Sequence, residues 1–195
     1  PSPSPEASPP VAARPPALQH RKGFYDERLN ADAELRRAVK AAIEAGYRID
    51  WEVMKEAKNQ LDELSISNEQ LIISAHRTPN RNVEYAKNVL KNDVKVIIAG
   101  AGGAAHLPGM MASHTHIPII GVPIESTSLN GIDSLLSIVQ MPKGIPVATV
   151  SIGKTGAKNA AILAAEILSL QNEQIREKLS SWKISMTNNV PYKPE

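Results

Sequence analysis

The chain has 195 residues, no cysteine, 42% hydrophobic residues and a formal net charge of +2. This length fits one domain of about 100–200 residues with an appended segment. The lack of cysteine excludes a disulfide framework, a thiol nucleophile and a zinc–thiolate site. Because 22 basic residues face 20 acidic ones, nothing in the charge suggests nucleic acid or a membrane surface as a partner. No apolar run is long enough for a membrane span or a signal peptide, which predicts a soluble, cytoplasmic protein.

The composition of the chain changes near residue 49. The part before it holds nearly half of the prolines and two thirds of the arginines. Residues 1–29 are rich in proline, alanine and serine and are predicted to be a disordered leader. Residues 30–48 predict a helix with Asn30 as its N-cap, Gly46 as its C-cap and a stripe of apolar residues at four-residue intervals between them.

From residue 49 to residue 183, β-prone and helical segments alternate. Strands are expected at 70–74, 95–100, 117–124 and 145–153, and helices at 51–64, 78–92, 104–114, 130–140 and 154–183, the last as one helix or two. The strands are continuous apolar runs, which is typical of strands covered on both faces. The alternation predicts a single doubly wound parallel sheet in a flavodoxin-like three-layer α/β/α domain, followed by a C-terminal tail at 184–195.

Residues that can perform chemistry follow three of the predicted strands, where ligands bind in such sheets. The first strand end carries Ser74, His76 and Arg77, and the third carries Glu125 and Ser126. An imidazole suits proton transfer near neutral pH, and a guanidinium suits a phosphate or carboxylate. The alternative is a loop that enters a helix, with a solvated arginine and a hydrogen-bonded histidine.

The second strand end is rich in glycine, with Gly100, Gly102 and Gly103. It departs from the dinucleotide fingerprint G-x-G-x-x-G because Ala105 occupies the third glycine position. A nicotinamide-dependent oxidoreductase therefore stays a distant alternative. The glycines are better explained by close approach of backbone to a small ligand, near the amides of a helix N-terminus.

Two further motifs give no site. Gly153-Lys154-Thr155 resembles the end of a phosphate-binding P-loop, but Ala148 stands where the required earlier glycine should be. His114 and His116 could share one face of an extended segment, yet a metal site needs a third ligand that their neighbours do not offer. Solvated loop histidines are the expectation there.

Four longer motifs resemble the bacterial-type PurE family, the 5-(carboxyamino)imidazole ribonucleotide mutases of purine biosynthesis. They read SAHRTP at 74–79, AGAGGAAHLPGMMAS at 99–113, PIIGVP at 118–123 and DSLLSIVQMPKGIPVATVSIGKTGAKNAAILAAEIL at 133–168. The resemblance covers about residues 50–183 in one continuous order.

The resemblance implies a reaction without cofactor or metal, in which a carboxyl group moves from an exocyclic amine to a ring carbon of the ribonucleotide. The path would be decarboxylation and recarboxylation, with His76 as the general acid and base and Arg77 on the substrate phosphate. The implied substrate-binding residues are Asp50, Ser74, Arg77, Gly100, Gly102, Gly103, Ala104, His106 and Leu107. The resemblance also implies a homo-octamer.

The family pattern is altered at the start of the domain. Its motif G-S-x-S-D, which follows the first strand, reads Gly46-Tyr47-Arg48-Ile49-Asp50 here, so Tyr47 stands at the position of a substrate-binding serine. The residues just before it favour a helix and include Glu44. We therefore expect the first strand to be atypical or missing and residues 1–48 to be foreign to the family. The alternative function is a catalytically impaired, oligomeric scaffold with a substituted N-terminus.

Overall fold

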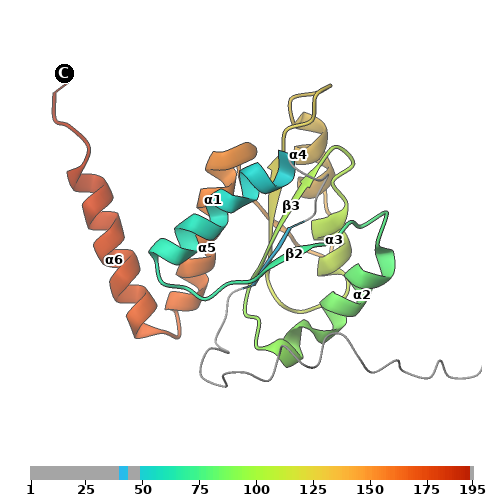
Figure 1. Ribbon diagram of the computed structural model, residues 1–195, viewed down its shortest axis with the longest axis horizontal. Helices are drawn as coiled ribbons and strands as arrows, with labels where there is room; N and C mark the ends of the chain where they lie inside the picture. Colours follow the sequence, from blue (N-terminus) through green and yellow to red (C-terminus); the bar gives the residue numbers. More distant parts are fainter. Residues whose placement is uncertain (1–39, 44–48, 194–195) are drawn as a thin grey trace, which may run out of the picture. The chain divides into compact units, whose positions relative to one another are not determined.

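The computed structural model describes residues 40–43 and 49–193. They form a five-stranded parallel sheet in the order β2-β1-β3-β4-β5, with helices on both faces (Figure 1). The strands are β1 (Lys40–Ile43), β2 (Gln70–Ile72), β3 (Ile97–Gly102), β4 (Ile119–Ile124) and β5 (Ala148–Thr149). The helices are α1 (Ile49–Glu63), α2 (Pro79–Asn88), α3 (Leu107–Ala112), α4 (Ile132–Val139), α5 (Gly153–Ser169) and α6 (Glu173–Asn188), with a short 3₁₀ helix η1 (Val89–Asn92). This is the predicted doubly wound, flavodoxin-like fold.

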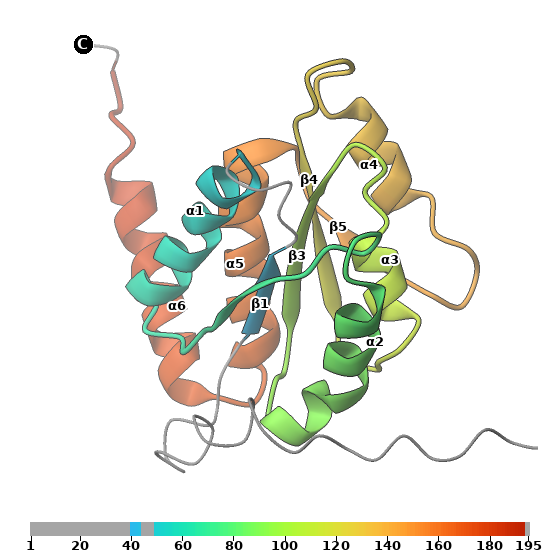
Figure 2. The same cartoon turned by 45° about the vertical axis from the view of Figure 1, so that its right-hand side comes forward.

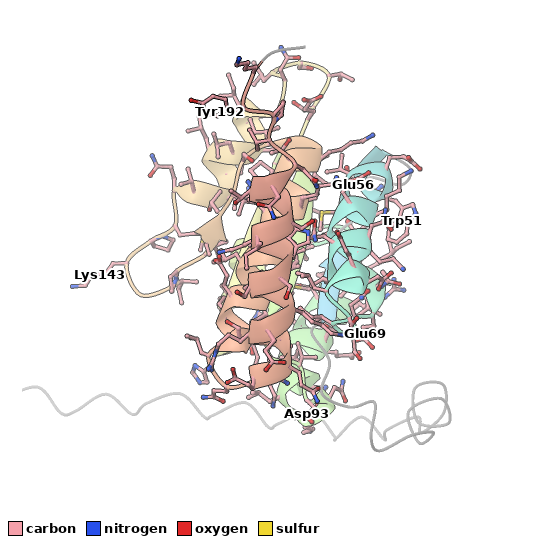
Figure 3. All side chains as sticks on the ribbon, turned by 90° about the vertical axis from the view of Figure 1, so that its left-hand side faces the viewer. Trp51, Glu56, Glu69, Asp93, Lys143 and Tyr192 are labelled. Atoms are coloured by element: carbon pink, nitrogen blue, oxygen red, sulfur yellow. The ribbon has the colours of Figure 1, made fainter. Side chains whose placement is uncertain are left out.

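The sheet lies between two helical layers (Figure 2). Helices α1 and α5 cover one face, and α6 packs on α5; helices α2, α3 and α4 cover the other. Strand β4 is buried throughout, as a strand covered on both faces must be. Met54, Leu61 and Leu64 are buried in the core on the side of α1. Trp51, labelled on α1 in Figure 3, is partly buried and packs against this core.

The first strand is present, whereas the sequence led us to expect it to be atypical or missing. Lys40–Ile43 forms β1 in the middle of the sheet, so the helix expected over 30–48 is wrong for these four residues. Ala42 pairs with Leu71 of β2 on one side and with Ala99 of β3 on the other. Helix propensity is a weak preference, and pairing on both sides satisfies buried backbone groups that would otherwise be orphaned. The rest of 30–48 lies outside the described residues, as does the predicted leader.

Other element boundaries shift by a few residues. The strand expected at 145–153 shortens to β5, and the helical segment expected at 154–183 is two helices. The second begins where the side chain of Asn172 accepts a hydrogen bond from the backbone N–H of Ile175, at 3.1 Å. Helix α6 continues to Asn188, past the domain boundary expected at 183. Within the described ranges, no helix is long and apolar enough to cross a bilayer.

The inner face of α2 buries two polar side chains that lack partners among the described residues. The side-chain amide of Asn82 is fully buried, and neither its nitrogen nor its oxygen makes a hydrogen bond there. One turn further along α2, the hydroxyl of Tyr85 is also buried and makes no hydrogen bond to the described residues. Burial raises the pKa of the Tyr85 phenol, and the Glu69 carboxylate adds to the shift. Leaving such groups unpaired costs about 1–3 kcal/mol each.

We therefore predict that Asn82→Leu stabilises the protein. Leucine has the same number of side-chain heavy atoms as asparagine, with the same branching at Cγ, and it removes the unpaired amide from an apolar environment. The free energy of unfolding should rise by about 1–2 kcal/mol in urea titration.

The matched control is Asn80→Leu, because Asn80 lies on the same helix and is exposed. That change should leave the midpoint within experimental error. A loss of stability in Asn82→Leu that Asn80→Leu does not share would show that the buried amide makes a favourable contact.

Candidate functional site

Two of the predicted site residues, His76 and His106, follow the two strands that flank β1. His76 follows β2, and His106 follows β3 at the start of α3. Because all strands are parallel, both loops leave the same edge of the sheet, at the carboxyl ends. The two rings meet there: Nε2 of His76 lies 2.8 Å from Nδ1 of His106, a hydrogen-bond distance.

The contact constrains the protons of the two imidazoles. The rings meet edge to face, with centroids 5.0 Å apart and planes inclined by 73°. In such a bond one of the facing nitrogens carries the hydrogen and the other accepts it. Both histidines are exposed in the single chain, so the pair is accessible to a ligand. The arrangement is suited to giving and receiving one proton.

A hydrogen-bonded turn holds the segment around His76. The hydroxyl of Thr78 accepts a bond from the backbone N–H of Ser74 and donates one to its carbonyl, both at 2.9 Å. The buried hydroxyl of Ser74 accepts bonds from the backbone N–H and the Nε of Arg77, each at 3.2 Å. Pro79 then begins α2, where its missing N–H costs nothing. The turn thus presents His76 and Arg77, both exposed, side by side in the chain.

The glycines at the end of β3 leave room for other groups. A Cβ on Gly100 would lie 2.4 Å from Sδ of Met54, so glycine lets α1 approach the sheet. A Cβ on Gly102 would lie 3.8 Å from Oδ1 of Asp50, which places this carboxylate of α1 beside the loop. Gly103 has a φ of 67°, which favours glycine, and a Cβ there would meet nothing within 4 Å. At Gly102 and Gly103 the loop therefore exposes backbone atoms rather than side chains.

Two serines of α4 contact this loop and were missed by the sequence analysis. The hydroxyl of Ser134 accepts a bond from the N–H of Gly103 at 2.8 Å and donates one to the carbonyl of Ile124 at 2.6 Å. The hydroxyl of Ser137 lies 3.3 Å from the carbonyl of Gly103. The sequence could have indicated this pair, because serines three residues apart in a predicted helix lie on the same helical face.

The remaining predicted residues are distributed more widely. Ala104 is exposed in the glycine-rich segment 100–106, called the glycine loop below, whereas Leu107 is buried at the start of α3. Tyr47 lies outside the described residues. Ser126 donates to both carboxylate oxygens of Asp133, at 2.8 and 2.9 Å, and so connects the loop after β4 to α4.

The two loop histidines lie away from this site. His114 and His116 are exposed, as expected, and they precede β4 at the opposite edge of the sheet. Over residues 40–43 and 49–193, no group of three His, Cys, Asp or Glu side chains is arranged to hold a metal ion.

Comparisons with known proteins agree on one family. The model of the AIR carboxylase family matches residues 40–189. The N5-carboxyaminoimidazole ribonucleotide mutase of Bacillus subtilis is 60% identical over 134 residues, covering 69% of this chain and 83% of that protein. The mutase of the same name from Brucella melitensis biotype 1 is 52% identical over 157 residues, covering 80% and 97%. The crystal structure of Treponema denticola PurE superposes with a TM-score of 0.69 at 28% identity, covering 77% and 92%.

The family match also corrects the expected boundary of the foreign segment. The family match begins at residue 40, the first residue of β1, whereas we expected the family-like part to begin near residue 49. The strand expected to be atypical or missing is therefore part of the sheet and lies within the family match.

We predict that Thr78→Val loosens the turn that carries His76. Valine keeps the shape of threonine but removes the hydroxyl that makes both bonds to Ser74. The free energy of unfolding should fall by about 1–2 kcal/mol in urea titration, and the amide of Ser74 should exchange faster with solvent.

Thr78→Ser is the matched comparison because it keeps the hydroxyl and loses only a methyl group. It should retain slow exchange at Ser74. Equal exchange rates in the two variants would contradict the role of the hydroxyl.

Proposed function

The chain belongs to the AIR carboxylase family, and on this premise we propose that it is a 5-(carboxyamino)imidazole ribonucleotide mutase. It would move a carboxyl group from the exocyclic amine of this ribonucleotide to a ring carbon, in the biosynthesis of purines. The observation that carries the proposal is the contact between His76 and His106, at the sheet edge where the glycine loop exposes its backbone.

His76 is proposed as the general acid and base. As the bond between the amine nitrogen and the carboxyl carbon breaks, carbon dioxide leaves and the nitrogen takes a proton from the imidazole. The ring carbon then bonds to carbon dioxide, and its hydrogen passes to the same imidazole. The proton given in the first step is recovered in the second, so the enzyme returns to its starting state. The facing nitrogen of His106 supports this cycle because it can share that hydrogen at 2.8 Å.

The anionic groups of the substrate would be held by Arg77 and by the backbone. The guanidinium of Arg77 is exposed beside His76, and its fork suits a phosphate. Asp50 is proposed to accept hydrogen bonds from the ribose hydroxyls, because its carboxylate lies beside Gly102. The glycine loop would lie against the flat imidazole of the substrate, where a side chain larger than hydrogen would reduce the space.

The structure offers no support for the impaired scaffold. That alternative rested on a lost first strand and on the altered motif at positions 47 and 49, and of these two grounds the first is removed, because β1 is in place between β2 and β3. The curated relatives that match most of the chain are named as mutases, which favours an active isomerase. The family has serines at positions 47 and 49, and this chain has Tyr47 and Ile49 there. Ile49 is the first residue of α1, and Tyr47 lies outside the described residues.

We further propose that the enzyme works as a homo-oligomer, the octamer that the PurE resemblance implies. Four apolar residues line the outer side of α4 and the turn before it, and each is 48–56% exposed: Leu129, Ile132, Leu136 and Val139. Exposed apolar patches of this kind mark protein interfaces. Released carbon dioxide must be kept near the ring carbon, and a second copy over the open sheet edge would exclude water from it.

We predict that His76→Asn abolishes interconversion of the two carboxylated aminoimidazole ribonucleotides, measured by ultraviolet absorbance. A proton-transfer group acts mainly in the transition state, so ribonucleotide binding should stay within about tenfold of the unmodified protein. Arg77→Ala should instead act mainly on ribonucleotide binding and weaken it by about 1.5–3 kcal/mol.

Lys87→Ala, an exposed change in the last turn of α2, is the control and should leave both quantities unchanged. Turnover in His76→Asn close to that of the control would refute the assignment of His76. An inactive unmodified protein that is folded and binds the ribonucleotide would refute the proposed function.

We also predict that Leu136→Asp reduces the size of the assembly. A carboxylate in an apolar contact between copies would lose its hydration, which disfavours association. Light scattering after size exclusion should show smaller species for this variant. The parent size should be kept in Lys91→Glu, a charge change at an exposed residue of η1. A parent-sized Leu136→Asp protein would place the interface elsewhere.

A further inference from the structure

Helix α4 contributes a fully buried hydroxyl that reaches the glycine loop. Ser134 has no exposed surface, and its hydroxyl joins two segments that are far apart in the sequence. It accepts from the N–H of Gly103 at 2.8 Å and donates to the carbonyl of Ile124, the last residue of β4, at 2.6 Å. A hydroxyl has a single hydrogen to donate, and that hydrogen is used on Ile124. Its lone pairs are therefore oriented toward Gly103.

The loop needs such an external bond because it has few side chains of its own. A Cβ at Gly103 would meet nothing within 4 Å, so no packing on that side fixes the residue, and its positive φ is a conformation of glycine. Its neighbours Gly102 and Ala104 are exposed. Two hydroxyls of α4 hold Gly103: that of buried Ser134 binds its N–H at 2.8 Å, and that of Ser137 lies 3.3 Å from its carbonyl. The preceding Gly102 is paired with Ile124 of β4, so Ser134 fixes the first residue that follows the strand.

The position of Gly103 constrains that of His106, which lies three residues further along the chain. The carbonyl of Gly103 accepts a bond from the N–H of Ala105, and that of Ala104 accepts one from the N–H of His106, both at 2.8 Å. These two consecutive tight turns leave little freedom between the fixed glycine and the first turn of α3. His106 in turn contacts Nε2 of His76.

From this chain of contacts we infer that Ser134 is a positioning residue, which fixes the glycine loop and through it the alignment of His106 with His76. The inference rests on the proposed function for its effect on turnover, but not for its effect on the loop. Ser134 touches no reacting atom; it acts through Gly103.

The first test measures the loop without any substrate. In Ser134→Ala, the N–H of Gly103 loses its acceptor, so its exchange with solvent should accelerate at least tenfold by NMR. Nuclear Overhauser contacts between the rings of His76 and His106 should weaken. Ser134→Cys, whose sulfur is a poorer acceptor, should lie between serine and alanine. It also serves as the graded variant if Ser134→Ala does not fold.

Ser169→Ala is the control, because among the described residues the Ser169 hydroxyl bonds within its own helix, to the carbonyl of Glu166 at 2.7 Å. It should leave the exchange of Gly103 unchanged. Unchanged exchange at Gly103 in Ser134→Ala would overturn the inference, whether or not the protein turns out to be a mutase.

The second test separates positioning from general stability. Ser134→Ala should lower kcat for the mutase reaction at least tenfold, while Ser169→Ala changes it less than twofold. If Ser134 acts through His106, the same change made in a His106→Asn background should lower kcat less than threefold further. If Ser134→Ala lowers kcat by the same factor in the His106→Asn background as in the parent protein, the inference is overturned. A folded parent protein without turnover would refute the proposed function, and the exchange of Gly103 would then decide the inference alone.

Discussion

The arrangement of the site depends on the pairing of β1 with two strands at once. Strands β2 and β3 are not neighbours in the sheet; each pairs with β1, and Ile43 lies opposite Ile72 on one side and Gly100 on the other. This register brings the carboxyl ends of β2 and β3 to the same edge. His76 and His106, which are thirty positions apart in the chain, meet there at 2.8 Å. Without β1, the strand that carries His76 would have no place in the sheet.

Chemistry and support come from different elements of the fold. The turn between Ser74 and Thr78 holds His76 and Arg77 by side-chain bonds to the backbone. The glycine loop has almost no side chains, and its N–H at Gly103 is held from α4 by Ser134. Small residues let a ligand approach the backbone, but they give up the packing that would fix it. A buried hydroxyl from a neighbouring helix replaces that packing with a directional bond.

Helix α4 has two faces with different tasks. Its inner face carries Ser134 and the buried Ile138, which pack toward the sheet, and its outer face carries the exposed apolar residues Ile132 and Leu136. In a homo-oligomer the outer face would contact another copy while the inner face holds the loop. The loop that Lys143 occupies continues from this helix (Figure 3). The proposed subunit contact and the bond that holds the loop would then both depend on this short helix.

The sequence alone determined the parallel α/β class, most element positions and the residues at the strand ends, because continuous apolar runs and helical periodicity are local properties. It also identified the family through motifs such as SAHRTP. It failed at Lys40–Ile43, where local helix propensity opposed a strand that pairing with β2 and β3 imposes. Only the tertiary structure decided that His76 faces His106 and that Ser134 reaches Gly103. These contacts join residues about thirty positions apart, and their geometry follows from strand order and register rather than from any local pattern.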